Sequence, residues 1–237
     1  MTDYVISPYP RASAAVMSSK QRFPVRRIFC VGRNYGAHAR EMGFSDKEPP
    51  FFFTKPADAL AETGATIPYP PLTKDLHHEI ELVLAVGKSG ANIAAEDAMM
   101  HIWGAGVGID FTRRDLQIAH REKGRPWDWG KAFDNSAPIS PLIPLADIPN
   151  AHAEFTTGRI WLSVNGELRQ DADLSELIWS VKDIIAFCSQ SVCLQAGDLI
   201  FTGTPAGVSA VEPGDNLSGG VDGIGEIQIT LGEREAV

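Results

Sequence analysis

The chain has 237 residues, of which 44% are hydrophobic and 22% charged; these values are ordinary for a folded globular protein and exclude extended disorder. Its formal net charge of -9 at pH 7 argues against nucleic acid as a partner, because phosphate binding requires a basic surface. No segment approaches the roughly 18 consecutive apolar residues of a membrane-spanning helix, so no membrane partner is expected either.

The first 26 residues are expected to form an N-terminal arm, and residues 27–237 a single domain. The arm is rich in Ser, Ala and Pro, and its prolines interrupt any regular element. Its apolar stretch from Ala12 to Met17 is too short for the core of a signal peptide. A cytoplasmic location is therefore expected.

The first predicted strand is Ile28–Val31, and a predicted helix follows that Asn34 caps and Gly43 ends. On this helix His38 and Glu41 lie three residues apart and therefore share a face. Such a pair is either an exposed surface pair or part of a site.

After a short predicted strand at Phe51–Thr54, the segment Leu76–Val86 carries two acids, Glu79 and Glu81, in an otherwise apolar run. Side chains alternate between the faces of a strand, so both carboxylates point the same way. Two carboxylates at such a short distance repel each other. A bound cation is the simplest way to compensate their negative charge. Oxygen donors without cysteine favour Mg²⁺ or Mn²⁺ and are compatible with Ca²⁺. The alternative is an edge strand whose acids face water.

Asp110 stands at the end of a predicted buried strand, Gly104–Ile109. In the helix predicted over Thr112–Arg121, Arg114 and Gln117 follow Asp110 by four and seven residues, which places them on roughly the same side. The alternatives are that Asp110 caps this helix and that Arg114 pairs with a neighbouring aspartate.

Lys131 lies in an aromatic, glycine-containing loop, Trp127–Asp134, and loops of this kind often carry function. The other predicted elements are a helix over Ala94–Trp103, a strand over Arg159–Val164, a turn at Asn165-Gly166, a helix over Leu174–Cys188 and strands over Asp198–Thr202 and Glu226–Leu231. This pattern has no internal repeat and predicts one β-rich α+β domain.

Several familiar motifs fail on inspection. Gly87-Lys88-Ser89 lacks the earlier glycine of a phosphate-binding loop, and Gly104–Gly108 lacks the spacing of a dinucleotide-binding turn. The sequence contains no G-x-S-x-G elbow and no H-E-x-x-H zinc motif. The three cysteines are Cys30, Cys188 and Cys193. They lack C-x-x-C spacing, which indicates reduced thiols.

Five separated segments carry a recognisable pattern. They are Cys30–Tyr35 with His38 and Glu41, His78–Leu82, Asp110–Gln117, Gly130–Phe133 and Thr202–Pro205. Together, in this order, they resemble the fumarylacetoacetate hydrolase family, and in particular its acylpyruvase and fumarylpyruvate hydrolase branch. The resemblance runs from about residue 27 to the C-terminus. It implies a catalytic domain of that family's type, a mixed β-sandwich roll with a few short helices.

The resemblance also implies roles for site residues. The implied ligands of one Mg²⁺ or Mn²⁺ are Glu79, Glu81 and Asp110. The implied catalytic residues are His38 and Glu41, which activate water, and Lys131, which stabilises charge near the metal. The implied substrate-binding residues are Arg114, Gln117 and Thr204, although Thr204 could instead only shape a turn. Val31 stands where the fumarylacetoacetases proper look to have a further aspartate ligand, which would leave more metal positions open.

The implied activity is hydrolysis of a carbon–carbon bond in a 2,4-dioxo acid. The expected substrate is fumarylpyruvate, which yields fumarate and pyruvate in the degradation of aromatic compounds such as gentisate. Its distal carboxylate needs a basic partner. The candidates are Arg33, Arg40, Arg113 and Arg125, and the sequence does not choose among them.

Two alternatives remain open at this stage. The same scaffold could decarboxylate oxaloacetate, or isomerise or decarboxylate a 2-hydroxydienoate. It could also bind a metabolite without catalysis. Similar proteins are typically homodimers, so a homodimer is expected.

Overall fold

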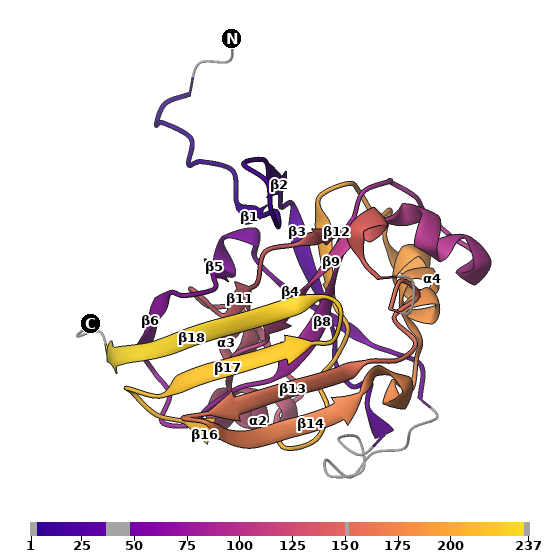
Figure 1. The fold of residues 1–237 in the computed structure, drawn as a ribbon. Coiled ribbons are helices and arrows are strands. Elements are labelled where there is room, and N and C mark those ends of the chain that lie inside the picture. Colours follow the sequence, from indigo (N-terminus) through magenta and orange to yellow (C-terminus); the bar gives the residue numbers. More distant parts are fainter. Residues whose placement is uncertain (1–3, 37–47, 150–151, 235–237) are drawn as a thin grey trace.

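The computed structural model describes residues 4–36, 48–149 and 152–234, which build two packed β-sheets with short helices at their margins (Figure 1). The predicted helix from Asn34 to Gly43, with His38 and Glu41, falls largely outside the described residues. No helix among the described residues is long and apolar enough to cross a membrane.

The larger sheet has eight strands and holds the acidic segment at its centre. Its strands in spatial order are β4 (Phe52–Lys55), β3 (Arg27–Val31), β15 (Asp198–Phe201), β8 (Ile80–Val86), β9 (Ile102–Ile109), β11 (Ala137–Ile139) and β5 (Leu60–Glu62), with β12 (Ile143–Pro144) also paired to β9. Strand β8 is buried at every position and pairs antiparallel with both β15 and β9. The alternative of an exposed edge strand is therefore wrong.

The second sheet has five strands and forms the front layer in Figure 1. In spatial order they are β14 (Glu167–Asp173), β13 (Arg159–Val164), β17 (Asn216–Val221), β18 (Gly225–Arg234) and β6 (Thr66–Tyr69). The predicted turn at Asn165-Gly166 joins β13 to β14, and both residues have the positive φ angles (52° and 81°) of a type I′ hairpin.

The main hydrophobic core lies between the two sheets. Leu82 and Leu84 of β8 belong to it together with Ile160 of β13 and Ile227 of β18. The alternate residues of β8, such as Val83, belong to a second cluster on the other face of the larger sheet. Because side chains alternate in this way, Glu81 lies on the face opposite Leu82 and Leu84, as the period-two pattern predicts.

Within the part of the chain that the structure describes, helices are few and short. They are η1 (Ala57–Ala59), η2 (Ala95–His101), α2 (Arg114–Glu122), α3 (Asp128–Lys131), η3 (Leu145–Asp147), η4 (Leu174–Glu176) and α4 (Val181–Ser191). The helix predicted over Leu174–Cys188 therefore begins later than expected. Ser180 caps α4 through a capping box with Asp183, and this cap separates it from the 3-10 turn η4.

The start of α2 also differs from the prediction. Thr112–Arg113 forms a short strand, β10, which pairs with β7 (Leu76–His77), and β7 in turn pairs with β16 (Ala210–Val211). The helix begins only at Arg114, and the side chain of its N-cap residue, Arg113, makes no capping hydrogen bond. Asp110 is therefore not a helix cap.

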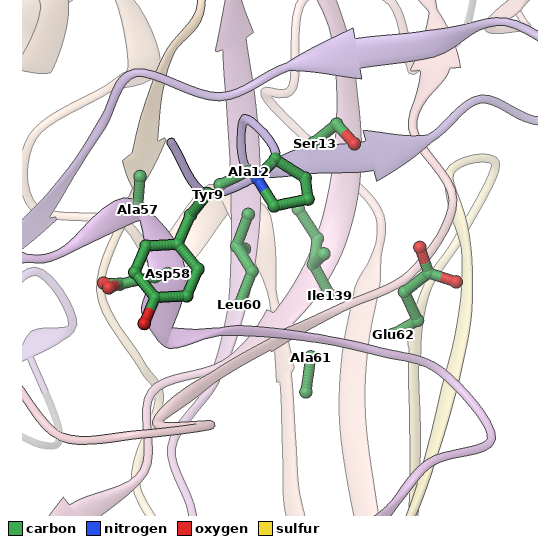
Figure 2. Close-up of a pocket in the computed structure, with 10 residues that line it drawn as sticks. Tyr9, Ala12, Ser13, Ala57, Asp58, Leu60, Ala61, Glu62 and Ile139 are labelled. Carbon is green, nitrogen blue, oxygen red and sulfur yellow. The ribbon is translucent and has the colours of Figure 1, made fainter. Parts of the chain in front are cut away.

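The N-terminal region contains a small hairpin of β1 (Ser13–Ala15) and β2 (Arg22–Pro24). Phe23 of this hairpin is buried, and its ring centroid lies 5.1 Å from that of Trp103. The hairpin thus packs on the larger sheet, whereas the exposed residues before it extend away from the body of the molecule (Figure 1). Tyr9 and β5 border a surface pocket of ≈ 540 Å³ (Figure 2).

Candidate active site

Two neighbouring strands bring three carboxylates together. Glu79 precedes β8, Glu81 lies within it, and Asp110 directly follows β9. The antiparallel register pairs Ile80 with Ile109, and the Asp110 amide donates to the Glu79 carbonyl at 2.8 Å. One ligand oxygen from each carboxylate lies within 4.8 Å of the others, and all three residues are buried. The acidic pair predicted from the sequence is thus part of a three-acid cluster.

Lys131, from the short helix α3, bridges two of these acids. Its Nζ donates to Glu79 Oε2 at 2.8 Å and to Asp110 Oδ2 at 2.7 Å. Burial alone lowers the pKa of Lys131, but the charges of Asp110 and Glu79 outweigh it and raise that pKa. Lys131 therefore carries a positive charge at neutral pH.

Arg114 forms an ion pair with Glu79 and donates to Gln117 Oε1 at 2.5 Å. Both residues are buried on α2, one turn apart, so the helix presents them jointly to the cluster. The alternative partners of Arg114 are thereby excluded: its carboxylate partner is Glu79, while Asp115 accepts a hydrogen bond from Thr73.

Lys55, at the end of β4, is a site residue that the sequence analysis missed. Its buried Nζ lies 2.8 Å from Asp110 Oδ1 and donates to the Phe111 carbonyl at 3.1 Å. Burial lowers its pKa, whereas Asp110 opposes that change. The sequence contained one signal for Lys55, a lysine at the end of an aromatic strand. The sequence of a single strand, however, does not show which of its faces is buried.

Glu81 has a different environment from the other two acids. The Gly203 amide donates to its Oε2 at 2.6 Å, and among the described residues no cationic side chain forms a salt bridge with it. Burial, and then the charges of Asp110 and Glu79, raise the pKa of Glu81 well above its ordinary value. Without a metal the raised pKa favours the protonated acid, so the charged carboxylate is stable here only when a further cation compensates it. Three clustered carboxylates with hard oxygen donors fit Mg²⁺ or Mn²⁺.

A buried glutamine from the second sheet connects the acidic segment to the Thr204 loop. Gln170 Oε1 accepts from His78 Nδ1 at 2.9 Å and from the Ile80 amide at 3.1 Å. Its Nε2 donates to Thr204 Oγ1 at 2.8 Å and to the Pro205 carbonyl at 2.9 Å. Burial lowers the pKa of His78 to about 4, so this imidazole is neutral at pH 7 and serves the network structurally.

The structure therefore groups most of the predicted site residues. The residues in direct contact around the cluster are Glu79, Asp110, Lys131, Arg114 and Gln117, with Glu81 beside them. Thr204 belongs to the loop that follows Gly203 and reaches the cluster through Gln170. His38 and Glu41 lie outside the described residues, so their placement stays a prediction.

The protein has two packed β-sheets and a buried site of three carboxylates. These features place it in the class of β-rich enzymes that the motifs predict. The chain belongs to the family described as fumarylacetoacetate (FAA) hydrolase C-terminal, which matches residues 27–231. The predicted family and fold class are thus confirmed.

Three similar proteins refine this assignment. The chain is 46% identical to the fumarylpyruvate hydrolase of a Ralstonia species over 188 residues, which are 79% of this chain and 95% of that protein. It is 41% identical to the mitochondrial oxaloacetate tautomerase FAHD1 of Rattus norvegicus over 199 residues, 84% of this chain and 88% of that protein. The crystal structure of fumarylpyruvate hydrolase from Pseudomonas aeruginosa in complex with Mn²⁺ and pyruvate is similar at a TM-score of 0.93 and 49% identity, covering 98% of this chain and 100% of the other.

Proposed function

We propose that this protein is a divalent-metal-dependent hydrolase that converts fumarylpyruvate and water into fumarate and pyruvate. The observation that carries the proposal is the buried cluster of Glu79, Glu81 and Asp110 with Lys131 bridging two of the acids. The similarity to two fumarylpyruvate hydrolases, one of them solved with Mn²⁺ and pyruvate, supports the choice of substrate and metal.

The charges of the site support an anionic substrate. Three carboxylates face three cations, Lys55, Lys131 and Arg114, so the fixed charges of these six groups balance. A divalent ion adds two positive charges in a buried environment, where an uncompensated charge is costly. An anionic 2,4-dioxo acid offsets this added charge. The balance therefore favours an acidic substrate.

Glu79, Glu81 and Asp110 would hold the metal. When bound, it would supply a Lewis acid that orients a 2-oxo acid and accepts developing negative charge. Arg114, Gln117 and Thr204 would hold the substrate's carboxylate and oxo oxygens through N–H and O–H donors.

His38, oriented by Glu41, would take a proton from water as the water oxygen adds to the distal carbonyl. Among the described residues, Lys131 uses two N–H bonds on Glu79 and Asp110, and its third would stabilise the resulting oxyanion. Collapse of that oxyanion breaks the bond between C3 and C4 and leaves the electron pair on the pyruvate half. A proton returned to C3 completes pyruvate, and fumarate is the other product.

Oxaloacetate tautomerisation is a second candidate, which the sequence analysis did not consider. The 41% identity to the Rattus norvegicus tautomerase favours it. That reaction moves a proton without adding water. A substrate panel of fumarylpyruvate, acetopyruvate and enol-oxaloacetate with Mn²⁺ separates the two activities, and the His38→Ala variant identifies the step that needs activated water.

We expect the wild type to cleave fumarylpyruvate most efficiently, and His38→Ala to lose cleavage by roughly 10²–10⁴-fold, the usual contribution of a general base. Tautomerisation without any cleavage would contradict the proposed hydrolase. No change in any of the three substrates would contradict the assignment as an enzyme.

We also propose a cytoplasmic homodimer, as the sequence predicts. The free thiols of Cys30, Cys188 and Cys193 support a reducing compartment. Exposed apolar side chains such as Leu72 and Trp129 support an interface in which a second copy of the chain covers them. A solution mass of one chain would contradict the dimer.

A further inference from the structure

An aromatic pocket of ≈ 430 Å³ lies beside the acid cluster, between β4 and the loop that leads into α3. The centroid of the Trp127 ring is 5.4 Å from that of Phe51 and 5.9 Å from that of Phe53. Lys131 lines the same pocket, and its Nζ lies 4.9 Å from the Phe53 centroid. That Nζ also donates to Glu79, so Lys131 connects the pocket wall with the acid cluster.

Arg33 is placed at the aromatic wall of this pocket. Its guanidinium carbon lies 5.2 Å from the centroid of the Phe51 ring. Gly32 makes the contact between the two segments feasible, because a Cβ there would lie 2.0 Å from the Phe51 ring. The Gly32 amide also donates to the Phe51 carbonyl at 2.9 Å, which fixes Arg33 relative to the wall.

The surroundings of Arg33 combine both signs of charge, with Glu48 and Arg121 nearby. Burial lowers its pKa, Glu48 raises it, and the charge of Arg121 lowers it further. A guanidinium nevertheless stays protonated at any physiological pH. Arg33 therefore brings a permanent positive charge to the aromatic wall, where it can attract an anionic group.

Arg113, another candidate, lies at a different pocket. Arg113 stacks on Phe133, with its guanidinium carbon 4.2 Å from the ring centroid, and lines a different pocket, with Trp129. Its Nη1 donates to the Trp129 carbonyl at 3.4 Å. Arg40 lies outside the described residues. Arg125 is exposed.

We propose that the aromatic pocket receives the acyl half of the substrate, a flat unsaturated chain, and that Arg33 binds the carboxylate at its far end. This inference rests on the proposed hydrolase function. A conjugated chain packs well against the rings of Phe51 and Trp127, and a guanidinium binds a carboxylate through two parallel N–H bonds. Lys131, at the inner end of the pocket, then lies near the carbonyl that water attacks. Arg33 is therefore a specificity-determining residue for a dicarboxylate.

The test compares two substrates that differ at the far end of the acyl group. Fumarylpyruvate carries a carboxylate there, and acetopyruvate has only a methyl group. For Arg33→Gln we expect kcat/KM to fall roughly tenfold or more further for fumarylpyruvate than for acetopyruvate, mainly through KM, as for a lost charge-assisted hydrogen bond. Arg33→Lys should recover part of the loss. Arg125→Gln is the matched control and should leave the ratio of the two substrates unchanged.

Inhibition by the product fumarate provides a second measurement. Its inhibition constant should rise in Arg33→Gln, while that of pyruvate stays near the wild-type value. If Arg33→Gln does not fold, Trp127→Leu should still raise KM for fumarylpyruvate more than for acetopyruvate. Equal losses for both substrates, or a changed ratio in Arg125→Gln alone, would overturn the assignment. A wild type that cleaves neither substrate would instead contradict the proposed function.

Discussion

Glu81 and Asp110 belong to one acid cluster but have opposite electrostatic surroundings. Asp110 contacts two buried lysines, Lys55 and Lys131, at 2.7–2.8 Å. Glu81 accepts a hydrogen bond from the Gly203 amide and has no salt bridge to the residues that the structure describes. The same substitution, acid to amide, should therefore change stability differently at the two positions.

In metal-free protein, Asp110→Asn should lower the free energy of unfolding by about 3–5 kcal/mol, because it leaves two buried ammonium groups without this partner. Glu81→Gln should leave that free energy unchanged or raise it, since it removes a carboxyl whose charged form burial disfavours and keeps an oxygen for Gly203. Urea denaturation with a chelator present measures both. Calorimetry should show weakened Mn²⁺ binding in both variants. Equal destabilisation by the two substitutions would contradict these electrostatic roles.

The sequence predicted the three carboxylates because their information is local: the period of a strand for Glu79 and Glu81, and a strand end for Asp110. The assignment of all three as ligands of one metal ion required the family resemblance. Lys55 was missed because its contact with Asp110 spans distant segments. The residue spacing within β4 does not indicate that its last side chain, Lys55, points toward Asp110 at the end of β9.

Gln170 shows how an element far along the chain determines the geometry of the site. Strand β14 belongs to the second sheet, yet this side chain forms four hydrogen bonds to the acidic segment and to the loop of Thr204 and Pro205. Secondary-structure patterns predicted β13 and β15 closely, but gave no sign of this link. A polar residue in a strand most often faces water, and only the packing of the two sheets buries this one.

We expect Gln170→Leu to lower the free energy of unfolding by about 2–5 kcal/mol, because several buried donors and acceptors lose their partners. It should also raise KM through displacement of Thr204. Gln228→Leu, on the exposed face of β18, is the control and should change stability by less than about 0.5 kcal/mol. Thermal unfolding and steady-state kinetics measure both effects. Equal stability of the two variants would show that the network contributes little.

At the scale of the whole molecule, two sheets enclose one core, and the N-terminal hairpin packs on the outer face of the larger sheet. The sequence predicted the single β-rich domain from the number of strands and turns. It did not predict the order of strands, which depends on long-range pairing such as the parallel pair of β3 and β15. The boundary expected after residue 26 stays a prediction, although Ala14, Phe23 and Val25 are buried.

Two changes test that boundary. Deletion of residues 1–10 should alter the free energy of unfolding by less than about 0.5 kcal/mol, because the described part of this segment is exposed. Phe23→Ala should lower it by about 3–5 kcal/mol, because the Phe23 ring is buried against Trp103. Chemical denaturation measures both. If Phe23→Ala has as little effect as the deletion, the hairpin belongs to a dispensable arm.

We propose that the buried acid cluster is the metal site of a fumarylpyruvate hydrolase. For the most direct test, the enzyme is stripped of metal with a chelator and the chelator is then removed. The metal-free enzyme is titrated with Mn²⁺ while fumarate and pyruvate are quantified. Our account predicts no turnover without metal, and activity that rises to saturation at one Mn²⁺ per chain and is abolished in Glu81→Gln. Full activity in the metal-free enzyme, or Mn²⁺ binding without formation of both products, would contradict it.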